Sequence, residues 1–154
     1  MNLSSMMMSD LVIFDDSIRS KRDLFEQIGQ LLEENGRATK AKNIVKDLYK
    51  REAETSTGIE DGFGIPHAKS RHVLKPTVCF VHGSSMKDYQ GLDDQPIECV
   101  FAILVPKKNS DMHLAILSTL SRKLMNKEFR DQLKAAASSD EVMKIIGNTT
   151  ETVS

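Results

Sequence analysis

Cysteine is scarce in this sequence, in which Cys79 and Cys99 are the only two among 154 residues. Both fall inside apolar runs, and two thiols cannot build a disulfide scaffold, so we expect buried thiols in a reducing compartment. A redox pair is the alternative, but it needs a CxxC-like spacing or an exposed, electropositive setting, and the sequence suggests neither. The low cysteine content therefore excludes the small disulfide-stapled folds.

The sequence also lacks an excess of charge, because 21 Lys and Arg stand against 22 Asp and Glu. Nucleic-acid-binding proteins carry a basic excess or a basic stripe, so this balance argues against a nucleic-acid partner. The longest apolar run, Cys99 to Val105, is too short to span a bilayer. Met1 to Ser9 has no basic start, long apolar centre or cleavage site of a secretory signal. We therefore expect a cytoplasmic protein without direct membrane insertion.

A chain of 154 residues is long enough to bury one core without disulfides or a metal. We expect a flexible N-terminal lead over residues 1–10, one domain over residues 11–147, and a loose polar tail over residues 148–154. The ends show no linker, which predicts a domain that stands alone.

Hydrophobic periodicity predicts helices and a strand in the first third of the chain. Leu11 to Phe14 indicates a first strand or an extended lead. From Ser20 the apolar spacing becomes helical, and Gly36 is a plausible stop. Thr39 is predicted to cap a second amphipathic helix that ends near residues 51–54.

The later part of the chain predicts two strands followed by helices. Thr77 to His82 is rich in β-branched and aromatic residues and indicates a strand, whereas Ser84 to Pro96 is a polar stretch in which Gly91 and Pro96 mark turns. Ile97 to Val105 is almost continuously apolar, as in a central strand that is buried on both faces. Asp111 is expected to cap the next helix. The predicted buried stripe of that helix comprises Leu114, Leu117, Leu120 and Leu124, and two further helices follow at residues 128–136 and 140–146. This order predicts a single-domain α/β sandwich.

The segment from Thr57 to Ala68 combines three glycines and one proline with a histidine, His67. Pro66 fixes its own backbone and favours an extended conformation at the residue before it. Gly62 and Gly64 leave the main chain open to a phosphate or a protein partner. The alternative is a glycine-rich turn with a surface histidine.

Four histidines occur, at positions 67, 72, 82 and 113, and neither helical i, i+4 pairs nor nearby carboxylates and thiolates indicate a metal site. We expect no metal and no cofactor. His113 lies near a predicted helix N-terminus, which suits an anion, although a partly buried core histidine is the alternative. Arg51 lies at a predicted helix C-terminus, where the helix dipole alone would explain a cation. His72 and His82, and the basic residues Lys69, Arg71 and Lys75, are interpreted as structural or solvated.

Three motifs occur in order: Arg51-Glu52, Ser56-Thr57-Gly58-Ile59 and Gly62-Phe63-Gly64-Ile65-Pro66-His67. From about Leu11 to Ile146 the chain resembles the enzyme IIA domains of the fructose/mannitol class in the bacterial phosphoenolpyruvate:sugar phosphotransferase system (PTS). One departure is Gly64, where the family pattern usually has alanine. The change would loosen the loop without altering the nucleophile.

The resemblance implies a mixed central β-sheet flanked by helices and a phosphohistidine mechanism. It implies that His67 accepts a phosphoryl group at the ring nitrogen remote from the main chain, and that His113 and Arg51 stabilise it. The implied donor is the phosphohistidine of HPr, the acceptor is a cysteine of a IIB component, and a membrane IIC component is involved only indirectly. We expect a phosphocarrier in fructose- or mannitol-type sugar uptake. The alternatives are a regulatory relay of the nitrogen-PTS type and a non-catalytic anion-binding module.

Overall fold

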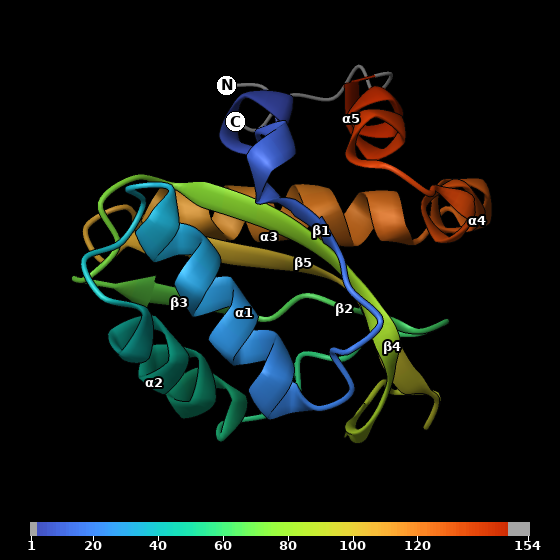
Figure 1. Ribbon diagram of the computed structural model, residues 1–154, viewed down its shortest axis with the longest axis horizontal. Helices are drawn as coiled ribbons and strands as arrows, with labels where there is room; N and C mark the ends of the chain where they lie inside the picture. The colour runs from blue at the N-terminus through green and yellow to red at the C-terminus, as the bar shows by residue number, and fades with distance from the viewer. Residues whose placement is uncertain (1–2, 148–154) are drawn as a thin grey trace.

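The computed structural model describes residues 3–147 (Figure 1). The elements, in chain order, are η1 (Leu3–Met6), η2 (Ser9–Leu11), β1 (Val12–Phe14), α1 (Lys21–Glu34), α2 (Ala41–Glu52), β2 (Phe63–Gly64), β3 (His67–Ser70), β4 (Thr77–Gln90), β5 (Pro96–Pro106), α3 (Ser110–Leu124), α4 (Lys127–Ala135) and α5 (Ser139–Gly147). Within these residues no helix is both long enough and apolar enough to cross a membrane.

The sheet is mixed and has the order β1-β4-β5-β2, with β3 also paired to β5. β4 and β5 are antiparallel, whereas β1 is parallel to β4, and β2 and β3 are parallel to β5. Gly64 pairs with Val100 and His67 pairs with Ile103, so the register is the same on both sides of Ile65-Pro66. β2 and β3 are therefore one extended edge segment, interrupted where proline lacks an N–H.

Helices cover both faces of the sheet, with α1 and α2 in front and α3 behind (Figure 1). Alternate residues of β5 point to the two sides. Cys99, Phe101 and Ile103 belong to the cluster that includes α3, whereas Val100 and Ala102 belong to the cluster that includes α1 and α2. The predicted doubly buried central strand and the α/β fold class are thus confirmed.

The helix boundaries were predicted well where a local signal exists. The hydroxyl of Ser20 accepts a hydrogen bond from the N–H of Asp23 and begins α1, and Gly36, with a φ of 68°, follows its end. The prediction that Thr39 caps α2 is wrong, because Lys40 is the N-cap and the N–H of Ala41 donates to Glu33 Oε1 in the preceding helix. The carboxylate of Glu33 in α1 therefore accepts the hydrogen bond that an N-cap side chain would otherwise accept.

The predicted start and buried stripe of α3 also need correction. Asn109, not Asp111, is the N-cap. Leu114 is 66% exposed, whereas Ile116 is fully buried and Leu117 is only partly covered. Two stripes fit the same leucines at helical spacing, and packing on β5 selected the one through Ile116, Leu120 and Leu124.

The predicted end of this strand at His82 is wrong, whereas the turn predicted at Gly91 is confirmed, since Gly91 directly follows β4. β4 continues to Gln90, and Met86 and Gln90 pair with Ile97 and Pro96. Register shifts occur on both sides of Met86, so the strand bends while Met86 and Tyr89 remain buried. A bulged strand loses the strict polar–apolar alternation from which strands are predicted.

The expected flexible lead over residues 1–10 includes side chains that pack in the core. Leu3 and Met7 are fully buried and Met6 is almost so, and η1 packs against α5 at the edge of the core. Two short 3₁₀ turns carry no helical periodicity from which this packing could be predicted. Residues 1–2 and the expected loose tail, residues 148–154, lie outside the described residues.

Met7 and Met8 are neighbours with opposite environments, since Met7 is fully buried and Met8 is 39% exposed. We predict that Met7→Ala lowers the free energy of unfolding by about 2–5 kcal/mol, because it leaves a cavity in the core. The matched control Met8→Ala should change it by less than about 0.5 kcal/mol. Urea unfolding followed by circular dichroism measures both. Equal effects of the two substitutions would show that the N-terminal segment does not pack as described.

Candidate active site

The loop before His67 is held together by hydrogen bonds between its own main-chain groups. The N–H of Ile59 donates to Phe63 O at 2.8 Å, and the N–H of Ile65 donates to Thr57 O at 3.0 Å. At the turn Asp61 and Gly62 have φ angles of 56° and 80°, a region that suits glycine. The carboxylate of Asp61 is fixed by Arg130 and Lys134 from α4. The loop thus delivers His67 to the start of β3 in one position.

A polar network ties this loop to α2 and β4. The hydroxyl of Thr57 lies 2.7 Å from Glu52 Oε2 and 2.5 Å from the hydroxyl of Tyr89, and the N–H of Thr57 donates to Glu52 Oε1. Lys21 of α1 lies 3.6 Å from Glu52 and over the Tyr89 ring. Burial raises the pKa of Tyr89 above its ordinary value, so the hydroxyl keeps its proton at neutral pH.

Gly64 has a physical explanation in this network. A Cβ at position 64 would lie 2.7 Å from the hydroxyl oxygen of Tyr89 and 3.1 Å from its ring carbon Cζ. The Tyr89 hydroxyl occupies the space that an alanine methyl would need and uses it to bond Thr57. The expectation that Gly64 loosens the loop is therefore wrong, because tyrosine fills the gap.

His67 lies at the wall of a cavity and is 7% exposed. Its Nδ1 is 2.6 Å from the carbonyl oxygen of Ile65, and the Nε–H of Arg51 donates to its Nε2 at 3.2 Å. Since a carbonyl can only accept, Nδ1 carries the proton and Nε2 carries the lone pair. Burial lowers the pKa of His67, and the positive charge of Arg51 lowers it further, against the opposing Ile65 bond. The ring is thus a neutral base whose unprotonated nitrogen, Nε2, is the one remote from the main chain.

His113 lies beside His67, with 5.1 Å between the ring centroids. Its Nε2 is buried and has no hydrogen-bond partner within residues 3–147. Burial, followed by the neighbouring His67, lowers the pKa of His113 to about 4. A buried polar atom without a partner is rare in native proteins and needs an explanation. An anion held between the two imidazoles would supply the missing partner.

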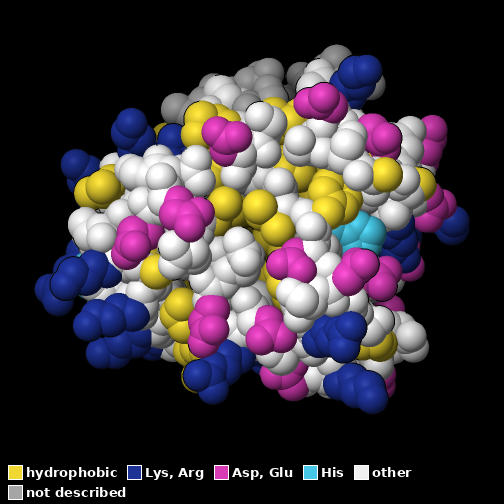
Figure 2. Space-filling model, in the orientation of Figure 1, with side chains coloured by type: hydrophobic (Ala, Val, Ile, Leu, Met, Phe, Trp, Pro, Cys, Tyr) yellow, Lys and Arg dark blue, Asp and Glu magenta, His cyan; other side chains and the backbone are white. Residues whose placement is uncertain are grey.

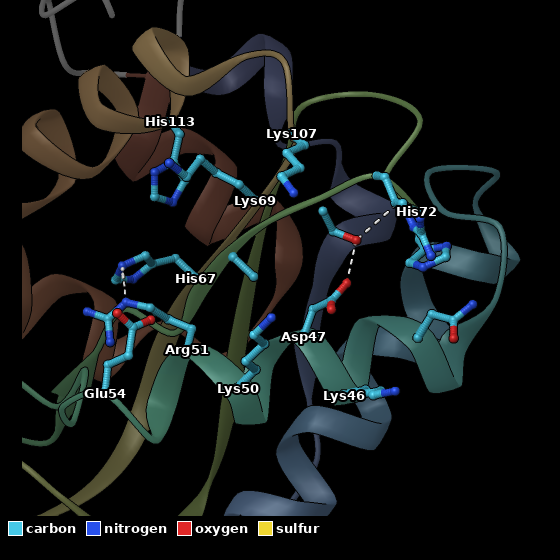
Figure 3. Close-up of a pocket in the computed structure, with 14 residues that line it drawn as sticks. Lys46, Asp47, Lys50, Arg51, Glu54, His67, Lys69, His72, Lys107 and His113 are labelled. Carbon is cyan, nitrogen blue, oxygen red and sulfur yellow. Dashed lines mark hydrogen bonds between the residues drawn. The ribbon is translucent and has the colours of Figure 1, made fainter.

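Arg51 projects from the last turn of α2 to the other side of His67 (Figure 3). Besides its contact with His67, its guanidinium donates from Nη1 to the carbonyl oxygen of Thr55 at 3.0 Å. The three residues singled out from the sequence, His67, His113 and Arg51, therefore meet in one place although they come from β3, α3 and α2.

His67, His113 and Arg51 line a cavity of about 810 Å³ that extends well beyond the two imidazoles. Sequence reasoning missed Lys50 and Lys107 and interpreted Lys69 and Arg71 as solvated, whereas all four line the cavity. Lys69 could have been found, since it lies two residues after His67 on the same side of an extended strand. Lys50 and Lys107 come from other elements, and no local signal marks them.

The remaining histidines lie in different settings. His72 lines the far end of the cavity (Figure 3). There the hydroxyl of Ser70 accepts a hydrogen bond from the main-chain N–H of His72 and donates one to the carboxylate of Asp47. His82 pairs across the strands with Cys99, and potential ligand atoms of His82, Glu98 and Cys99 lie within 4.8 Å of one another. The interpretation that no histidine has a thiol and a carboxylate nearby is therefore wrong for His82. Burial raises the pKa of Cys99 to about 12, which disfavours the thiolate that a metal needs.

The surface shows no basic stripe on the face in Figure 2, where acidic and basic side chains are interspersed, with Lys and Arg gathered toward the left edge.

A neutral histidine held at a cationic cavity by an α/β scaffold is an arrangement suited to carrying a phosphoryl group.

Comparison with known proteins defines the family. Residues 5–149 match the model of the phosphoenolpyruvate-dependent sugar phosphotransferase system EIIA 2 family, so the chain belongs to this family. It is 34% identical over 150 residues to the PTS system fructose-specific EIIA component of Haloferax volcanii, covering 97% of each chain. As the family is that of phosphohistidine carriers, the chain is a phosphotransferase.

Solved structures support the same fold. The nitrogen regulatory protein IIA-Ntr of Neisseria meningitidis matches with a TM-score of 0.86 and 29% identity, covering 94% of this chain and 98% of that chain. Enzyme IIA of mannitol, solved in complex with phosphorylated IIB from Escherichia coli, matches with a TM-score of 0.76 and 18% identity, covering 92% and 97% of the two chains. The second match shows the fold alone.

Substitution at Gly64 tests the packing of the loop on Tyr89. We predict that Gly64→Ala destabilises the fold by about 1–3 kcal/mol, since the new methyl overlaps the Tyr89 hydroxyl. Tyr89→Phe should cost about 1–3 kcal/mol, because it leaves Thr57 with one partner fewer. The double variant should be more stable than the sum of the two losses predicts, because phenylalanine makes room for the methyl. Strictly additive losses in urea unfolding would rule out this steric coupling.

The lowered pKa values predict how the site titrates. An NMR titration should place the pKa of His67 below 6.5 and that of His113 near 4. Unfolded histidine takes up its proton near pH 6.5, so these residues should leave stability unchanged above that pH and reduce it as the pH falls toward 4. Arg51→Gln should raise the pKa of His67, because it removes a nearby positive charge. The control Arg22→Gln, at an exposed pair with Glu26, should not change it.

Proposed function

We propose that this EIIA domain carries its phosphoryl group on Nε2 of His67. HPr supplies the group and a cysteine of a IIB component receives it, in the cytoplasm and in the service of fructose-type sugar uptake. The observation that carries the proposal is the 2.6 Å contact between Nδ1 of His67 and the Ile65 carbonyl, which leaves Nε2 as the nucleophile facing the cavity. The sugar class rests on the fructose-specific relative that matches along nearly the whole of both chains.

In the accepting step the lone pair of Nε2 attacks the phosphorus of phospho-HPr. The donor's P–N bond breaks, and its electron pair returns to the donor imidazole. Nδ1 keeps its proton throughout and donates it in the hydrogen bond to the Ile65 carbonyl. The phosphorylated ring therefore carries a positive charge and is a good leaving group. In the second step a IIB thiolate attacks the phosphorus and the electron pair of the P–Nε2 bond returns to His67. The low exposure of His67 keeps water from competing.

Arg51 and His113 supply the charge stabilisation that phosphoryl transfer needs. In the resting site an N–H of Arg51 is bonded to Nε2, so the guanidinium must leave that atom before attack. Once displaced, it lies beside the new phosphoryl oxygens and pairs with them. His113, with its unpartnered Nε2 on the opposite side, donates to another oxygen when that nitrogen carries the proton.

A regulatory relay is the second candidate, and the likeness to a nitrogen regulatory IIA protein favours it. Such a relay would use the same phosphohistidine to control another protein. The two functions differ in the acceptor: a sugar-uptake domain transfers its group to the thiol of a IIB protein, whereas a relay retains it until a regulated partner binds. Transfer to a panel of IIB proteins separates them.

Phosphorylation by phosphoenolpyruvate, enzyme I and HPr tests the site. We predict one acid-labile, base-stable phosphate on the wild-type chain and none on His67→Ala, because no other imidazole has the same fixed tautomer and cationic partners. His72→Ala is the matched control, since His72 lines the same cavity, and it should label normally. Full labelling of His67→Ala would refute the assignment, and phosphate binding without a covalent label would indicate an anion-binding module instead.

A further inference from the structure

The cavity beside His67 is larger than a phosphoryl group on a histidine requires. Arg51 and His113 already flank Nε2, yet the cavity of about 810 Å³ continues along α2 and β3. Pockets of about 300–1,000 Å³ are the size that holds small molecules. Space for a ligand thus lies next to the phosphorylation site.

Positive charge is concentrated in this additional space. Figure 3 shows the side chains of Lys50, Lys69 and Lys107 directed toward the space between His67 and Asp47. They come from α2, β3 and the residue after β5, and no ion pair within residues 3–147 engages any of the three. The whole lining contains six Lys and Arg side chains and two carboxylates, Asp47 and Glu54. Cations that outnumber the carboxylates of a concave site attract anions.

The rest of the lining narrows the class of anion. Ala68 is its only aliphatic residue, and apart from three imidazoles it has no aromatic ring. A nucleobase or an acyl chain would find neither a stacking partner nor an apolar wall. Asn43 and Asp47 offer amide and carboxylate groups of the kind that bind hydroxyls. The chemistry fits a small, hydroxyl-rich molecule that carries a phosphate.

We propose that the lysine-lined part of the cavity, formed by Lys50, Lys69 and Lys107, binds a sugar phosphate. Its phosphate lies among the three lysines and its hydroxyls face Asn43 and Asp47. Because the ligand shares the cavity with Nε2 of His67, it competes with phospho-HPr, and a phosphoryl group on His67 repels it. This competition rests on the proposed function, whereas binding to the unphosphorylated chain does not. The product class of sugar uptake would then restrain its own supply.

Isothermal titration of the unphosphorylated chain with four probes tests the binding. Fructose 1-phosphate should bind at least tenfold more tightly than inorganic phosphate, and fructose should not bind. AMP should bind no more tightly than inorganic phosphate. The variant Lys50→Ala/Lys107→Ala should lose at least tenfold in affinity for fructose 1-phosphate, whereas Lys75→Ala/Lys87→Ala, with lysines outside the cavity, should not change it.

A second set of measurements separates this proposal from the assignment of His67. His67→Gln should keep fructose 1-phosphate binding and lose labelling, and the Lys50/Lys107 variant should still be labelled, with inhibition by fructose 1-phosphate abolished. The proposal would be overturned if fructose 1-phosphate did not bind, or if it bound equally well to the variant without Lys50 and Lys107. Neither result would affect the assignment of His67 as the phosphorylated residue. Slower labelling of the lysine variant in the absence of any ligand binding would assign the cations to protein docking and overturn it as well.

Discussion

The hydrogen bond from Nδ1 of His67 to the carbonyl of Ile65 is the contact on which the proposed chemistry of this chain depends. It decides which nitrogen keeps its proton and which one is the proposed nucleophile. The carbonyl can make this bond because Ile65 and Pro66 continue the extended segment along β5, with the register kept on both sides. A backbone acceptor cannot change its protonation state, so the tautomer persists over the whole range of pH in which the ring is neutral.

The surroundings of this bond are rigid for reasons that lie in other elements. Glu52, Thr57 and Tyr89 connect α2, the loop and β4 through hydrogen bonds of 2.5–3.1 Å. Tyr89 also occupies the space beside Gly64, so the glycine and the tyrosine are parts of one packing solution. Arg51 is adjacent to Glu52 in sequence, which means that the network that anchors the loop also positions the guanidinium. Precise placement matters because phosphoryl transfer is governed mainly by positioning and charge.

The electrostatics of the cavity suit both steps of a relay. In the proposed function the neutral, poorly exposed imidazole of His67 accepts the phosphoryl group, and Arg51 and His113 stabilise its negative charge. The lysines elsewhere in the cavity form the separate site that we propose for a sugar phosphate. The scarcity of aromatic and aliphatic residues in the cavity lining favours polar ligands.

Local sequence was sufficient for the central strand, the helices and the reactive loop. The run from Ile97 to Val105 determined a strand buried on both sides, and Pro66 determined an extended backbone before His67, because both signals lie within a few consecutive residues. The segment from Gly62 to Ala68 is buried, so the expectation that its glycines leave the main chain open is wrong. The continuation of β4 to Gln90 and the burial of Met7 depended on partners far along the chain. The meeting of Arg51, His67, His113 and the cavity lysines, and the role of Tyr89, were likewise decided by tertiary structure. Side chains from separate elements become neighbours only when the sheet register and the helix packing are set, and no short stretch of sequence encodes that geometry.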